Sequence, residues 1–251
     1  APCAGASWLG GTAAAGRGPD RRPVGRGFQA DLLVHERGGR ASPLVAAVRG
    51  VSSLTHSVGG AVPPAFVAEA GQRLAGLWRE HGLTQPPYVG CFQAPYLDIG
   101  PPSVQMVPLE HIPVVQPLRP ISWSGPGATF EPADDARPQV YVTLRTVAND
   151  TALIRDALAG LASLDVQVLV TVGPMGDPDA LGPQPAHVRV ERFVPQTLVL
   201  PHASVVVSHG GSGTFPGALA HGLPQVCLPQ AAERKSAVRG TGVEPGGRRT
   251  L

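Results

Sequence analysis

The stretch SVVVSHGGSGTFPGALAHGLPQVCL, residues 204–228, predicts a complete strand–loop–helix–strand unit. The strand predicted over 204–208 has three successive valines at 205–207, so it is apolar on both faces, which is typical of a strand buried in a parallel sheet. A glycine-rich loop over 209–214 follows, and then a predicted helix over 215–221 with Pro216 in its first turn. The segment QVCL over 225–228, apolar after its first residue, predicts the next strand.

The same alternation extends back to residue 139. Further buried strands are predicted over the ranges 139–144, 166–172 and 187–192. A helix with apolar residues at helical spacing lies between the first two, capped by Asn149 or Asp150. Strands that alternate with helices predict an α/β fold, with a parallel sheet covered on both faces.

The first half is less regular. Strands are predicted over 31–35 and 51–57, helices over 42–49 and 62–81, and short extended pieces over 103–107 and 112–115. The proline-rich stretch 117–138 predicts an interdomain linker. The linker divides the chain into an N-terminal domain, 28–116, and a C-terminal domain, 139–233. Residues 1–27 and 234–251 have no apolar period and are predicted to be disordered.

Composition excludes several classes of protein. A net charge of +2 and 15% charged residues argue against nucleic-acid binding, which needs a dense Lys/Arg surface. No apolar run is long enough to span a membrane. Cys3, Cys91 and Cys227 are too far apart for a disulfide framework or a zinc ribbon, so we expect a cytoplasmic protein. The first residue is Ala1 rather than methionine, from which we expect a fragment or a processed chain.

The loop 209–214 has the composition of an anion site. Glycines let a phosphate approach the backbone N–H groups, and the following helix directs its positive end to the same point. Ser212 and Thr214 add hydroxyl donors, and His209 adds a ring nitrogen. The local chemistry therefore favours a diphosphate or another anion.

The sequence of the loop differs from three other glycine-rich motifs. The loop lacks the G-K-[ST] ending of a P-loop and the spacing of G-x-G-x-x-G. A nucleophile elbow would need glycine at Thr214. A tight structural turn remains an alternative, as does an NAD-dependent oxidoreductase.

Residues 188–233 resemble the donor-site block of the family-one, UDP-glycosyltransferase-like enzymes. The nearest likeness is to the bacterial branch that glycosylates macrolides and other natural products. VPQ (194–196), HGGSGT (209–214) and GLPQVCLPQ (222–230) carry the resemblance, and it extends back through VYVTL (140–144), YLDIGPPS (96–103) and ADLLVHE (30–36). It implies a GT-B fold of two Rossmann-like domains, both incomplete here, with the region of the catalytic histidine absent.

The resemblance also implies roles for particular residues. Those that would hold the donor diphosphate are His209, Gly211, Ser212, Gly213, Thr214 and Thr146. Val194 and Gln196 would line the nucleobase pocket, Glu233 would bind sugar hydroxyls, and Glu36 would orient the catalytic histidine. Two departures from the family are Arg145, where glycine is usual, and Arg234, where a sugar-binding glutamine is usual.

The implied reaction is inverting transfer of a sugar from a dTDP- or UDP-linked donor to a hydroxyl of a small hydrophobic acceptor. Neither a metal nor another cofactor is then expected, and Asp177 and Asp179 are read as solvated loop acids rather than a metal motif. The alternative is an inactive remnant that only binds nucleotide.

Overall fold

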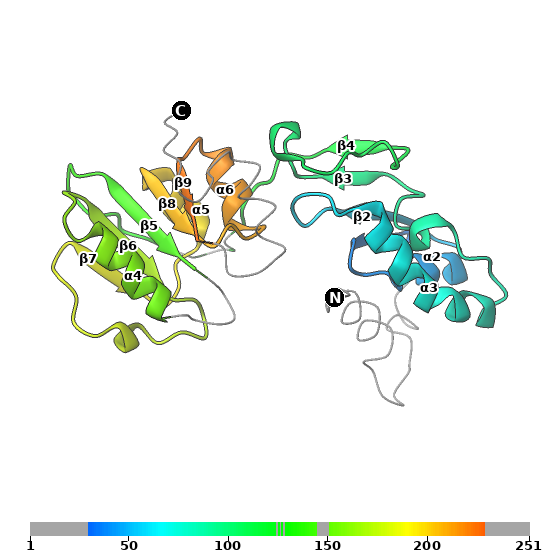
Figure 1. The fold of residues 1–251 in the computed structure, drawn as a ribbon, viewed down its shortest axis with the longest axis horizontal. Coiled ribbons are helices and arrows are strands. Elements are labelled where there is room, and N and C mark those ends of the chain that lie inside the picture. The colour runs from blue at the N-terminus through cyan, green and yellow to red at the C-terminus, as the bar shows by residue number, and fades with distance from the viewer. Residues whose placement is uncertain (1–29, 124, 126, 128, 145–150, 229–251) are drawn as a thin grey trace. The chain divides into compact units, whose positions relative to one another are not determined.

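The computed structural model describes residues 30–123, 125, 127, 129–144 and 151–228. The predicted disordered segments 1–27 and 234–251 lie outside these residues, as do Thr146, Glu233 and the predicted caps Asn149 and Asp150. The chain divides into two units between Leu118 and Arg119, and each unit contains one parallel sheet (Figure 1).

Unit 1 has four parallel strands in sequential order: β1 (Leu32–Glu36), β2 (Ser52–His56), β3 (Tyr96–Asp98) and β4 (Val115–Pro117). The helices α2 (Ser42–Arg49) and α3 (Pro64–Glu80) connect the first three strands. Each crossover leads to the next strand on the same side of the preceding one, and right-handed crossovers of this kind place their helices on one face of the sheet. The core on that face includes Val67 of α3 and Tyr96 of β3, whereas Leu32 and Val34 of β1 are 47% and 57% exposed.

Two sequence predictions in unit 1 were wrong. The extended piece predicted over 103–107 is interrupted at its start, because residues 103 and 104 belong to the short 3₁₀ helix η2 (Pro102–Val104), and extended backbone resumes at Gln105. The extended piece predicted over 112–115 overlaps the strand β4 only at Val115, and the three-residue strand β3 was not predicted. Both short strands depend on pairing with neighbours distant in sequence, such as Thr55 with Tyr96. Another 3₁₀ helix, η1 (Pro87–Gly90), lies between α3 and β3.

Unit 2 has five parallel strands in the order β7-β6-β5-β8-β9. The strands are β5 (Gln139–Thr143), β6 (Gln167–Thr171), β7 (Val188–Glu191), β8 (Val205–Ser208) and β9 (Gln225–Cys227). The helices are α4 (Thr151–Leu161), α5 (Gln196–Val199) and α6 (Thr214–Ala220), with the 3₁₀ helices η3 (Pro178–Leu181) and η4 (Leu200–His202). Each predicted strand and helix of this half is present, with ends shifted by a residue or two.

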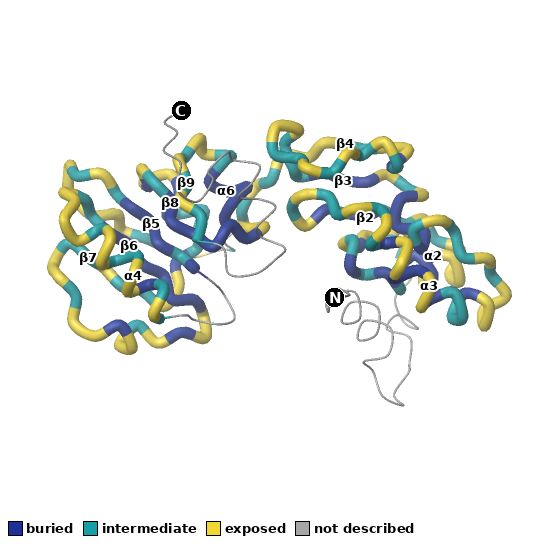
Figure 2. Tube along the Cα trace, in the orientation of Figure 1, coloured by how far each residue is buried: buried dark blue, intermediate teal, exposed yellow. Residues whose placement is uncertain are grey.

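Both faces of the unit 2 sheet are covered, as the β-branched strands predicted. Alternate residues of β5 enter two separate cores: Val140 and Val142 pack with Ile154 of α4, and Tyr141 packs with Val199 of α5 and Ala218 of α6. The three central strands are correspondingly among the most buried parts of the chain (Figure 2).

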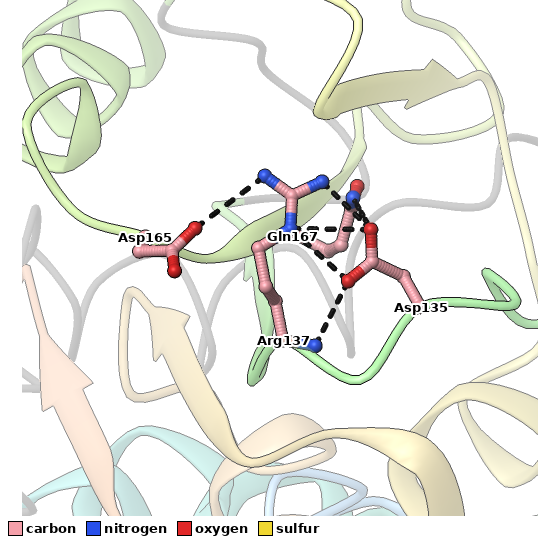
Figure 3. A network of polar contacts seen from close by, with 4 residues as sticks. All are labelled: Asp135, Arg137, Asp165 and Gln167. Atoms are coloured by element: carbon pink, nitrogen blue, oxygen red, sulfur yellow. Dashed lines mark hydrogen bonds and ion pairs between the residues drawn. The ribbon is translucent and has the colours of Figure 1, made fainter.

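The second part of the predicted linker is attached to unit 2. Asp135 accepts hydrogen bonds from Arg137 and from Gln167 of β6, and Arg137 also lies 3.7 Å from Asp165 (Figure 3). The side-chain hydrogen bonds from Arg137 hold the pKa of Asp135 well below its usual range. Further along the sheet, Arg189 of β7 donates to the carbonyl of Glu131. These residues therefore extend the unit 2 surface rather than form a free connection.

Candidate functional site

The order of the unit 2 strands identifies where a ligand is expected. The chain moves from β5 outward through β6 to β7, and then crosses to β8 and continues to β9 on the other side. β5 and β8 are thus neighbours at the point where the strand order reverses, with Thr143 paired to Ser208 at their carboxyl ends. Open α/β sheets bind ligands outside the carboxyl ends of the strands at such a switch point. The predicted anion loop leaves β8 here.

The loop between β8 and α6 is shaped by two glycines. Gly210 has a φ of 71° and donates its N–H to the hydroxyl of Ser208 at 3.1 Å. At Gly211 a Cβ atom would overlap Nε2 of His209, so the buried imidazole lies where a side chain would otherwise be. The backbone can therefore take this path only with glycine at these two positions.

The N–H groups that follow are left for another partner. Within the described residues, the backbone N–H groups of Gly211, Ser212, Gly213 and Thr214 donate no hydrogen bond. The carbonyl of Gly211 accepts from Phe215 at 2.9 Å, which begins the helix, and no side chain caps it at Gly213. Four successive unpaired donors at the start of a helix attract a negative charge.

Two predicted site residues that are distant in sequence are joined by a hydrogen bond. Gln196, the first residue of α5, donates its side-chain N–H to the hydroxyl oxygen of Thr214 at 2.7 Å. Thr214 keeps its own hydroxyl proton, so it can still donate to a ligand. This contact fixes the V-P-Q segment beside the glycine loop, and the roles of both residues at a donor stay predictions.

Val194 belongs to the core rather than to an open wall. Val194 is 7% exposed and packs with Tyr141, Leu169 and Val199. Only its backbone or a small part of its side chain is available to a ligand, and its predicted role at the nucleobase stays a prediction.

A buried polar contact between β5 and β6 is not among the residues predicted from the sequence. The hydroxyl of Tyr141 in β5 lies 2.9 Å from that of Thr171 in β6, and both are buried. Burial raises the pKa of Tyr141, so the phenol stays protonated, and it also contacts Gln196. The alternation of polar and apolar residues in V-Y-V-T (140–143) was a usable signal, since residues 141 and 143 share a face.

The residue predicted in the other unit, Glu36, ends β1 and is exposed. Its carboxylate accepts the N–H of Gly38 at 2.6 Å, and its strand neighbour in register is His56. The preceding residue, His35, is 8% exposed, and burial lowers its pKa. The structure therefore brings Gln196, His209 and 211–214 together in unit 2 and places Glu36 in unit 1. The predicted diphosphate residue Thr146 and sugar residue Glu233 lie outside the described residues.

The acidic pair in the 173–182 loop has a local role. The carboxylate of Asp177 accepts the N–H of Asp179 at 3.2 Å and so caps η3. This is the behaviour expected of loop acids. None of the helices in the described residues has both the length and the apolar character that crossing a membrane requires.

Comparison with known proteins gives consistent results. Residues 155–247 match the family described as "Erythromycin biosynthesis protein CIII-like, C-terminal domain". The chain is 41% identical over 151 residues to 4'-demethylrebeccamycin synthase of Lentzea aerocolonigenes, covering 60% of this chain and 33% of that protein. It is 32% identical over 245 residues to the elloramycin glycosyltransferase ElmGT of Streptomyces olivaceus, covering 90% of this chain and 59% of that protein. The chain thus spans between a third and three fifths of the length of these relatives.

Two solved structures have the same fold. The glycosyltransferase SnogD of Streptomyces nogalater is 29% identical with a TM-score of 0.71, over 86% of this chain and 60% of that one. The glycosyltransferase SsfS6 of Streptomyces sp. SF2575, complexed with thymidine diphosphate, is 27% identical with a TM-score of 0.65, over 84% of this chain and 55% of that one. The predicted fold class, α/β of the GT-B type with parallel sheets, is confirmed.

Proposed function

Since the chain is related in sequence and in fold to bacterial glycosyltransferases of antibiotic biosynthesis, we propose that it transfers a sugar from a nucleoside-diphosphate donor to a hydroxyl of a small natural product. The observation that carries the proposal is the row of unpaired N–H groups from Gly211 to Thr214 at the switch point of unit 2. A thymidine diphosphate complex of a relative with 27% identity supports a diphosphate as the ligand of this loop.

The proposed chemistry is an inverting displacement. The acceptor hydroxyl loses its proton to a general base and forms a bond to the anomeric carbon, while the bond from that carbon to the diphosphate oxygen breaks. Negative charge grows on the departing diphosphate, and donors already in place stabilise it in the transition state. The amides of 211–214 and the hydroxyl of Thr214 would do this, with Thr146 as a further donor. No metal ion is part of this proposal.

The other predicted residues complete the proposed site. Gln196, held against Thr214, would position the nucleobase side of the donor together with the backbone of Val194. Glu233 would bind the sugar hydroxyls, and Glu36 would orient the general base. Free Cys91 and Cys227 suit a reducing compartment, which supports the expected cytoplasmic location.

Binding and turnover must be measured separately on the full chain. We expect saturable binding of dTDP or UDP by isothermal titration calorimetry, and a mass increase of one sugar in an aromatic polyketide or macrolide aglycone incubated with a dTDP- or UDP-sugar. Binding without product would favour the nucleotide-binding remnant. Binding of NADH but of neither diphosphate would contradict the proposal.

A further inference from the structure

The guanidinium of Arg40 in unit 1 is buried without a hydrogen-bonding partner in the described part of the chain. Only 3% of this residue is exposed, and its Nε and Nη1 atoms form no hydrogen bond there. Its Cζ atom lies 5.3 Å from the ring centre of Phe66, which stabilises the cation through the aromatic face alone. Burial lowers the pKa of Arg40, yet an arginine stays protonated in proteins. A buried cation with unused donors is unfavourable unless a counter-charge joins it.

Two helices begin next to this cation, and neither supplies that counter-charge. α2 starts at Ser42, two residues beyond Arg40, and Phe66 is in the first turn of α3. Both helices lack a side-chain cap and an acidic residue in the first turn. The N-terminus of a helix carries partial positive charge, so both helix starts add to the positive potential near Arg40. The N–H groups of Ser42 and Phe66 already donate to the carbonyls of Gly39 and Pro63, so the side chain of Arg40 holds the unused donors.

Two carboxylates of unit 1 are engaged elsewhere, one of them Glu36, which attracts Arg40 through space. Glu36 accepts the N–H of Gly38 at 2.6 Å, and Asp98 accepts those of Gly100 and Gln105 at 3.0 and 2.7 Å. Among the described residues, no acidic side chain lies within ion-pair distance of Arg40. The described part of the chain therefore supplies no ion-pair partner for Arg40, and Glu36 attracts it only through space.

We propose that Arg40 and the first turns of α2 and α3 form a second anion site, which binds the carboxylate or phosphate group of a small ligand. The site follows the carboxyl end of the parallel strand β1, where α/β sheets bind ligands. A guanidinium suits such a group because its planar donors match two oxygens of one oxyanion. The proposal goes beyond the donor function, which is assigned to the loop 209–214 of the other unit.

The first test follows the Nε–H resonance of Arg40 by NMR in the full, unaltered chain. Inorganic phosphate and sodium acetate are titrated separately, with sodium chloride holding the ionic strength constant. We expect a saturable shift of this resonance with phosphate, acetate or both. The anion that saturates the shift at the lower concentration identifies whether the site prefers a phosphate or a carboxylate group. A resonance that moves with neither anion overturns the proposal.

The second test compares Arg40→Met with Arg37→Met, a neighbouring arginine whose Nη1 already donates to the carbonyl of Gly60. We expect a saturating anion to raise the melting temperature of the unaltered chain and of Arg37→Met by about 5 °C more than that of Arg40→Met. Phosphate bound at the loop 209–214 would raise all three equally, so only the difference counts. Equal shifts in all three overturn the proposal. If Arg40→Met does not fold, the NMR titration decides.

Discussion

The loops that follow β1 and β8 have similar sequences, but their backbone N–H groups are hydrogen-bonded in the first loop, and within the described residues those of 211–214 are unpaired in the second. Each leaves a parallel strand, contains Gly-Gly and enters a helix: HERGGR over 35–40 and SHGGSG over 208–213. In each, a glycine makes room for a polar side chain two residues earlier. A Cβ at Gly38 would lie 2.7 Å from Oε1 of Glu36, and one at Gly211 would overlap the ring of His209.

The difference lies in which groups remain for a ligand. In the first loop the N–H of Gly38 is bound by Glu36, that of Gly39 by the carbonyl of Glu36, and that of Arg40 by Gly38. Its unused donors belong to a side chain, Arg40. In the second loop the N–H groups of 211–214 are themselves unused. Similar local sequences therefore give one site built from a side-chain cation and one built from backbone amides.

The largest expected effect is that of Gly211→Ala. The added methyl group would collide with the ring of His209, so the loop must move and its amides lose their alignment. We expect dTDP affinity to fall about 100-fold, equivalent to about 3 kcal/mol. Gly160→Ala is the matched control, because nothing lies within 4 Å of its new methyl group, and it should change affinity less than twofold. Calorimetry on both variants checks this, and near-normal binding by Gly211→Ala would rule out an amide-lined site.

Removing the hydroxyl of Thr214 should have a smaller effect. Thr214→Val deletes one donor to the diphosphate and the acceptor of Gln196. We expect about a tenfold loss of dTDP affinity, in line with about 1.5 kcal/mol for a hydrogen bond to a charged group. Gln196→Ala and the double variant complete a thermodynamic cycle. Strictly additive losses would show that the contact between the two side chains does not position the donor.

Glu36→Gln should affect the loop after β1 and leave donor binding at the loop after β8 unchanged. The carboxylate charge that strengthens the hydrogen bond to Gly38 is lost, so unit 1 should be destabilised by about 1 kcal/mol. Affinity for dTDP should stay within twofold, while sugar transfer should fall if Glu36 orients the base. Asp31→Asn, an exposed carboxylate immediately before β1, is the control for both measurements. A parallel loss of dTDP affinity would contradict the division of roles between the units.

The smallest expected effect is the pH dependence due to His35. Burial lowers the pKa of His35 from its ordinary value of 6.5, so the folded chain binds this proton less readily than the unfolded chain. Its contribution to stability is therefore complete above pH 6.5 and decreases as the pH falls below it. The melting temperature of the unaltered chain should drop between pH 7.5 and 5.5 by more than that of His35→Gln. Removing the exposed His81 should leave the drop unchanged, and an equal drop in His35→Gln would refute the assignment.

The strands and helices of unit 2 could be predicted because they are long and periodic. Residues 205–208 are apolar on both faces, which only a sheet covered on both sides satisfies. The three-residue strands β3 and β4 have too little periodicity of their own to be recognised and exist through pairing. The polar face of residues 141 and 143 could be recognised from the sequence, but the partner of Tyr141 could not, since Thr171 lies 30 residues away.

The sequence by itself determined the α/β class and the glycine loop with its neighbouring helix, because periodicity and glycine act over a few residues. Only the tertiary structure decided that β5 and β8 are neighbours, that Gln196 reaches Thr214, and that Arg40 is buried with no ion-pair partner among the described residues. Pairing, burial and the use of donors depend on groups far apart along the chain, and their positions are set only when the sheets are complete.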